Sequence, residues 1–165
     1  MDDHRGNPRL GNLCFQPGLL TAAGAETVHD TTQVIEVTID GVFYRKTAIT
    51  DGTTPTTDGV SGKTFTALAA DETCWFVWCL DAALAVKVVQ SEIKDVDGDE
   101  DVPLEYPGFP DIPLTLTPFA IQRVQTAGNS SAWTFGASNW NATGVTDLIL
   151  NVASLPRRVP TTATA

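Results

Sequence analysis

The sequence predicts an all-β fold, namely a β-sandwich or jelly-roll-like domain of about nine short strands with extended terminal arms. Three observations predict it. Threonine and valine are abundant while charged residues make up only 18% of the chain, a composition that suits strands better than helices. Short alternating or apolar segments recur between turn-forming residues. Finally, the chain shows no long amphipathic helical repeat.

The length and net charge of the chain limit the classes of protein to which it can belong. A chain of 165 residues can form one domain with a sizeable core. Its formal net charge of −10 repels nucleic-acid phosphates and anionic lipid headgroups, so we expect neither nucleic acid nor a membrane as partner. The first residues lack the basic start and apolar run of a secretory signal, which predicts a protein made in the cytoplasm.

The two ends differ from the middle of the chain. Both carry proline and charged residues without apolar periodicity, which opposes helix and central strand alike. We predict an extended N-terminal arm over residues 1–12, a β-sandwich domain over residues 13–155 and an extended C-terminal tail over residues 156–165. Arginine side chains in these arms could pair with carboxylates of a partner. The candidate partner-contact residues there are Arg5, Arg9, Arg157 and Arg158.

Residues 34–49 predict a β-hairpin. In the first half Ile and Val alternate with polar residues, and the Asp40-Gly41 pair that follows favours a two-residue type I′ turn. Because such a turn fixes the register, Glu36 should face Arg45, and apolar residues should face one another on the other side.

The rest of the chain continues the strand pattern. Residues 50–63 form a long polar loop, of a length that is usually functional or mobile. Residues 73–80 are apolar on both faces, which predicts a central strand covered by a second sheet and by a partner subunit. Residues 95–118 are acidic and then proline-rich, which predicts an irregular connection. The other predicted strands are residues 65–68, 84–91, 119–126, 131–136 and 147–153.

Two tryptophans lie on the predicted central strand. Trp75 and Trp78 have opposite parity, so their rings should face opposite ways. One ring should lie in the core and the other at a contact, and both are candidate partner-contact residues. A sugar-stacking platform, the alternative, would need both rings on one face.

Catalytic groups are scarce. His4 lies in the N-terminal arm, and adjacent residues on a strand, such as His29 and Asp30, point apart. No nucleophile elbow, phosphate-binding glycine loop or His-x-x-His pair is present. We therefore expect a protein that is not an enzyme and that carries no cofactor.

Metal-binding patterns are also missing from the sequence. Cys14, Cys74 and Cys79 form neither a metal motif nor an even disulfide set, and we expect buried thiols. Cys74 and Cys79 have opposite parity, so they cannot bridge each other within one strand. The acidic run at residues 95–101 starts like a calcium loop but lacks the Gly and Glu of an EF-hand. We interpret it as a solvated turn, with a bound divalent cation as the alternative.

After the N-terminal arm, six segments between residues 33 and 156 carry a resemblance to a known family. They are residues 37–44 (Val-Thr-Ile-Asp-Gly-Val-Phe-Tyr), 88–90 (Val-Val-Gln), 111–114 (Asp-Ile-Pro-Leu), 117–124 (Thr-Pro-Phe-Ala-Ile-Gln-Arg-Val), 133–136 (Trp-Thr-Phe-Gly) and 152–156 (Val-Ala-Ser-Leu-Pro). This succession resembles structural proteins of tailed bacteriophages, particularly the small decoration, or cement, proteins of the capsid exterior.

The resemblance implies a virion protein of the capsid surface, assembled in the host cytoplasm. It implies a β-rich homotrimer whose partner is the major capsid protein and which clamps neighbouring capsid subunits together. Arms that order on docking would reach across subunit boundaries, and a closed trimer would cover exposed strand edges. The alternatives are a phage tail or baseplate β-module and a carbohydrate-binding module.

Overall fold

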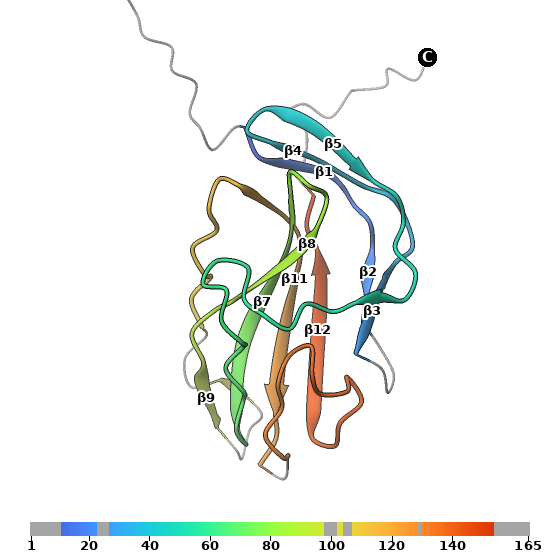
Figure 1. The fold of residues 1–165 in the computed structure, drawn as a ribbon. Coiled ribbons are helices and arrows are strands. Elements are labelled where there is room, and N and C mark those ends of the chain that lie inside the picture. The colour runs from blue at the N-terminus through green and yellow to red at the C-terminus, as the bar shows by residue number, and fades with distance from the viewer. Residues whose placement is uncertain (1–10, 23–26, 98–101, 104–106, 129, 154–165) are drawn as a thin grey trace, which may run out of the picture.

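The computed structural model of the chain describes residues 11–22, 27–97, 102–103, 107–128 and 130–153. The predicted all-β fold is confirmed, since these residues form twelve strands, more than the nine or so expected. None of them forms a helix, and therefore none offers a helix that could cross a membrane. The strands lie in three antiparallel sheets arranged around one main core, as in a sandwich (Figure 1).

The largest sheet has six strands. In the order β10-β9-β7-β11-β12, with β8 also pairing β7, it places β7 at its centre. The strong apolar segment predicted as a central strand is therefore confirmed. The bounds are β7 (Glu72–Asp81), β8 (Val86–Gln90), β9 (Lys94–Asp97), β10 (Val102–Pro103), β11 (Leu116–Thr126) and β12 (Val145–Asn151).

Two three-stranded sheets cover the inner face of the large sheet. Their orders are β1-β4-β5 and β2-β3-β6. The core joins them to the large sheet, because Ile35 and Val37 of one layer pack in the same buried cluster as Phe76 and Trp78 of the other. The bounds are β1 (Leu13–Pro17), β2 (Leu20–Thr21), β3 (Val28–Thr31), β4 (Ile35–Ile39), β5 (Val42–Lys46) and β6 (Gly52–Thr53).

The predicted hairpin is β4–β5. Its register is the predicted one, with Glu36 opposite Arg45, and the Arg45 Nε lies 3.2 Å from a Glu36 carboxylate oxygen. Asp40 and Gly41 have φ angles of 50° and 75°, both in the left-handed region that a type I′ turn requires. The second strand ends at Lys46, earlier than the residue 49 expected.

Two predicted strands are wrong. Residues 65–68 and 131–136 are loops, joined to each other by one isolated bridge in which Leu68 and Trp133 exchange backbone hydrogen bonds of 2.8 and 2.9 Å. Their apolar side chains, such as Phe65 and Trp133, are buried as anchors of the loops in the main core. An apolar run shows that a segment is buried but does not show whether its backbone joins a ladder.

The acidic and proline-rich stretch at residues 95–118 was expected to be irregular, and this is only partly correct. It contains most of β9, all of β10 and the start of β11. Pro118 lies within β11 where the register shifts between Pro118 and Ala120, and such an irregularity tolerates a residue without an N–H. Residues 107–115 are irregular, as predicted.

Short strands were missed. β1, β2 and β3 lie in a region where no strand was predicted, and β6 lies inside the long polar loop. Most of these strands have two to four residues, too few for a periodic pattern to stand out.

Candidate partner-contact surface

The predicted opposition of the two tryptophans is confirmed, and Trp78 is the one in the core. It is fully buried, and its indole Nε1 donates a hydrogen bond of 3.0 Å to the side-chain oxygen of Gln122. The ring also contacts His29, with ring centroids 4.9 Å apart. Trp78 therefore has no exposed surface with which to meet another molecule.

Trp75 lies on the opposite, outer face of the large sheet. Its ring is partly buried and stacks on Phe109, with centroids 5.3 Å apart and planes 21° from parallel. Its Nε1 donates a hydrogen bond of 3.0 Å to the carbonyl oxygen of Pro107. Since both partners belong to the connection between β10 and β11, this connection covers part of the indole.

The same connection covers the middle of the outer face. Ile112 and Leu116 pack there on Val77, Cys79 and Val89 in a second buried cluster. We expected a partner subunit to cover this face of the central strand, but over β7 and β8 the chain covers it with its own residues.

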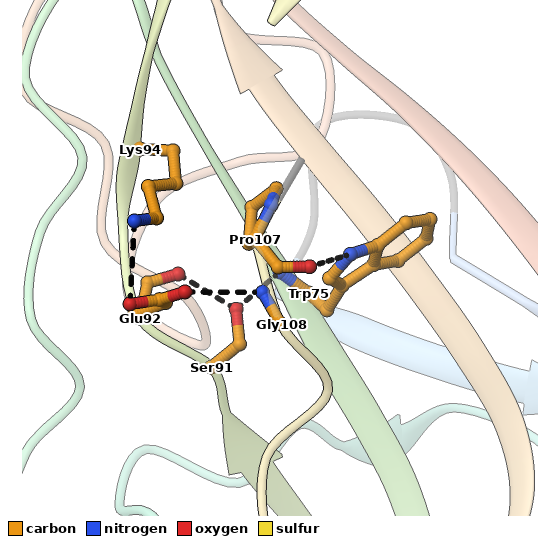
Figure 2. A network of polar contacts seen from close by, with 6 residues as sticks. All are labelled: Trp75, Ser91, Glu92, Lys94, Pro107 and Gly108. Carbon is orange, nitrogen blue, oxygen red and sulfur yellow. Dashed lines mark hydrogen bonds and ion pairs between the residues drawn. The ribbon is translucent and has the colours of Figure 1, made fainter. Parts of the chain in front are cut away.

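Polar contacts hold the start of this connection in place (Figure 2). One carboxylate oxygen of Glu92 accepts a hydrogen bond of 3.2 Å from the Gly108 N–H, and the other lies 3.5 Å from the Lys94 ammonium group. The hydrogen bond from Gly108, followed by the charge of Lys94, lowers the pKa of Glu92 although burial opposes this. Ser91 completes the network by accepting a hydrogen bond from the Trp75 backbone N–H.

Beyond this cover, the outer face over β11 and β12 carries exposed apolar side chains. Register places Leu148 beside Arg123 and Trp75 in one row, and Leu150 beside Ile121 in the next. Both leucines are 47% exposed, and Phe109 is 63% exposed. We call the apolar side chains on this face the outer strip: Trp75, Phe109, Ile121, Leu148 and Leu150.

A second apolar surface lies on another sheet. Phe15 of β1 and Phe43 of β5 are 50% and 56% exposed, and their ring centroids are 6.3 Å apart. Phe15 is the extra residue where the β1–β4 register shifts between Cys14 and Gln16, and this bulge allows its ring to point outward. We call these two residues the phenylalanine pair. The surface of the protein thus carries apolar side chains on two separate sheets.

Metal ligands do not gather among the described residues. No three of their His, Cys, Asp or Glu side chains lie close enough to hold a metal ion. The three cysteines are buried and unbridged, as predicted, and Cys74 and Cys79 belong to different buried clusters. Burial raises the pKa of the Cys14 and Cys74 thiols to about 12 and raises that of Cys79 as well, so none forms a thiolate near neutral pH.

The arginines predicted to contact a partner, Arg5, Arg9, Arg157 and Arg158, lie outside the described residues, as do residues 98–101 of the acidic run. The last two residues of the predicted N-terminal arm are described, and both bond to the domain. The Gly11 carbonyl accepts a hydrogen bond from Gly41, and the Asn12 side chain donates to the carbonyl oxygens of Leu114 and Leu116.

Sequence reasoning missed most of the outer strip. Leu148 and Leu150 have the same parity on a predicted strand, so they could have been placed together on one face. Nothing in the sequence shows that this face is left uncovered. Phe109 lies in a connection and Phe15 at a bulge, where sequence spacing carries no information on direction, whereas the predicted hairpin register already placed Phe43 opposite Thr38.

Comparisons of the chain with protein-family models, with curated proteins and with solved structures find no match.

Proposed function

We propose that this chain is a virion structural protein that decorates a tailed-phage capsid and bridges neighbouring copies of the major capsid protein. The observation that carries the proposal is the pair of exposed apolar surfaces on two different sheets, the outer strip and the phenylalanine pair. A bridging protein needs two contact surfaces that do not compete for one partner. Resemblance to decoration proteins, stated above, supplies the identity of the partner.

Apolar exposure of this kind supports a contact role. Aromatic side chains contribute most to protein interfaces when they are buried at the centre of a contact, and Trp75 and Phe109 form such an anchor. Arg123 lies in the same row as Trp75 and can pair with a carboxylate of the partner. The net charge of −10 favours a partner surface that is basic or neutral.

Electron cryo-microscopy of particles assembled with and without the chain tests the location. We expect density for the chain on the capsid exterior at junctions between capsid subunits, and none there when the chain is left out. Density on the tail alone would replace the proposal with the tail or baseplate alternative. Purified chain that binds neither particle nor tail would overturn both readings.

Substitutions test the two surfaces. Leu148→Glu in the outer strip and Phe43→Glu in the phenylalanine pair should each lower occupancy on particles at least tenfold, since each buries a charge in an apolar contact. Val60→Glu is the matched control, because Val60 is 54% exposed but lies on the loop after β6. If all three variants occupy particles as fully as the wild type, neither surface is used.

We also propose that the protein acts as a homotrimer. Light scattering of the purified chain should give three times the mass of one copy, in solution or on release from particles. A single copy under both conditions would contradict this part. A glycan array, or a sugar titration followed by tryptophan fluorescence, tests the carbohydrate-binding alternative, which requires a sugar to bind and to change the signal of Trp75 at the surface.

A further inference from the structure

His29 is a buried histidine whose ring has no well-formed hydrogen bond to the described residues. It lies on β3, in the sheet β2-β3-β6, and is only 3% exposed. Its ring packs on Trp78 of the large sheet, with centroids 4.9 Å apart. Within the part of the chain that the structure describes, neither ring nitrogen makes a hydrogen bond. A buried polar group in this state destabilises the fold, and a charge placed there would do so far more.

The ladders of the sheet that carries His29 are short. Among the described residues, β3 pairs with β2 through Leu20–Thr31 and Thr21–Asp30, and with β6 through Val28–Thr53 and His29–Gly52. Hydrogen bonds at the edges of the sheet add to these ladders and join it to Ile49 and to the Asn151 side chain.

A further weak point follows β6. The Thr54 hydroxyl is buried and also lacks a partner among the described residues. One tie to the rest of the core is the hydrogen bond of 3.0 Å from Trp140 Nε1 to the Val28 carbonyl oxygen. A sheet whose ladders are this short should open at a lower free energy than the long, paired strands β7 and β11.

The imidazole is closely surrounded on the side of β6. A Cβ atom built on Gly52 would lie only 3.0 Å from both Cε1 and Nε2 of the ring. The ring therefore lies directly against the backbone of β6 at Gly52 and fills the space that a side chain would take there.

Few charged groups act on the ring. Asp30 on β3 favours a charged imidazole and Lys46 on β5 opposes it, while β6 presents Gly52 and β7 presents Trp78, neither of which is charged. Burial outweighs Asp30 and the nearby Gly52 backbone, so the pKa of His29 falls from 6.5 to about 4.

We propose that the β2-β3-β6 sheet is an acid-operated latch, in which a proton on His29 breaks its packing on Trp78 and releases this sheet from the large sheet. In the opened form the His29 imidazole lies in water and has its ordinary affinity for protons. In the closed form its affinity for protons is lower. Acid therefore favours the opened form, in which Trp78 becomes accessible.

The size of the effect follows from the two proton affinities. In the opened form His29 titrates near 6.5 and in the closed form near 4, so the proportion opened grows as the pH falls between these values. At pH 5 the opened form is almost fully protonated at His29, whereas the closed form is mostly unprotonated. The ratio of opened to closed molecules should therefore rise about 20-fold from pH 7 to pH 5.

Hydrogen exchange measured by mass spectrometry on the full chain tests the latch. After correction for the intrinsic effect of pH on exchange, peptides that cover β3 and β6 should lose protection about 20-fold from pH 7 to pH 5. Peptides from β7 and β11 should keep theirs. Loss of protection in all strands at the same pH would mean global unfolding and would overturn the latch.

Two variants separate His29 from other acid effects. His29→Gln cannot take up a proton, and its β3 and β6 peptides should exchange at the same corrected rate at both pH values. His4→Gln removes the other histidine of the chain and should behave as the wild type. A wild-type response that persists in His29→Gln would overturn the proposal.

A titration of the wild-type protein by NMR keeps the test independent of whether His29→Gln folds. The imidazole signal of His29 should show a midpoint well below 6.5, and new exchange broadening should appear in β3 and β6 over the same pH range. A midpoint near 6.5 while both strands remain protected would contradict the latch.

Discussion

At the scale of single residues, Trp78 connects the core to a series of side-chain hydrogen bonds. Its Nε1 donates to Gln122, whose amide group in turn donates a hydrogen bond of 2.8 Å to an oxygen of Asp147 on the edge strand β12. Gln122 is fully buried, so these two partners satisfy most of its polar atoms. The chain of bonds links three neighbouring strands through their side chains.

We predict that Trp78→Ala lowers the free energy of unfolding by about 3–5 kcal/mol, because it leaves a large cavity and an unpaired oxygen on Gln122. Urea denaturation followed by circular dichroism measures the change. Trp75→Ala is the control, and its cost should be clearly smaller because its ring is partly exposed. Equal costs for the two variants would contradict the assignment of Trp78 to the core.

At the scale of elements, the β4–β5 turn depends on one glycine. Gly41 has a φ of 75°, and a Cβ added there would meet no atom within 4 Å. The requirement is therefore one of backbone conformation alone and not of space.

Gly41→Val should lower the free energy of unfolding by about 1–2 kcal/mol, because a β-branched residue resists a left-handed backbone. Thermal unfolding measures the effect. Gly41→Asn should cost much less, since asparagine tolerates this conformation. An unchanged midpoint for Gly41→Val would show that the turn can relax without loss.

The loop after β6 is organised around one carboxylate. Asp58 accepts hydrogen bonds from the backbone N–H groups of Val60, Ser61 and Gln90 and from the Ser61 hydroxyl. The Gln90 bond fastens the loop to β8. Burial by itself would raise the pKa of Asp58, but these hydrogen bonds outweigh burial and lower the pKa below its ordinary value of 3.8.

A lowered pKa sets the direction of the acid effect. The ionised Asp58 stabilises the fold above pH 3.8, and this stabilisation is lost as the pH falls through the lower folded-state pKa. Asp58→Asn keeps an acceptor but removes the charge, so the difference in stability between it and the wild type should shrink as the pH falls below 4. Chemical denaturation at several pH values measures this, and a constant difference would refute the role of the charge.

At the scale of the whole molecule, the terminal arms remain a prediction. Four of the ten basic residues of this acidic chain lie in residues 1–12 and 156–165. Ten extended residues reach about 33 Å at about 3.3 Å each, which is enough to cross onto a neighbouring subunit. Gly11 and Asn12 bond to the domain, so an experiment on the N-terminal arm should remove residues 1–10 only.

Removal of either arm should leave the unfolding midpoint of the domain unchanged and weaken binding to particles on the order of tenfold, as expected for the loss of two exposed arginine pairs. Binding titrations at two salt concentrations measure the loss, which should be smaller at high salt. Wild-type occupancy by both shortened chains would show that the arms serve only solubility.

The sequence by itself determined the features that depend on neighbouring residues. Alternation and the Asp40-Gly41 pair predicted the register of the β4–β5 hairpin, because a two-residue turn leaves one register. Parity separated Trp75 from Trp78, and Cys74 from Cys79, because successive side chains of a strand point to opposite faces.

Only the tertiary structure decided which surfaces are covered. Residues 107–116 fold over β7 and β8 but stop short of β12, and this leaves Leu148 and Leu150 exposed. Burial of His29 against Trp78 likewise depends on two sheets that meet across the core. Such contacts join residues far apart in the chain, and the free energy that selects them comes from packing of the whole domain rather than from any local pattern.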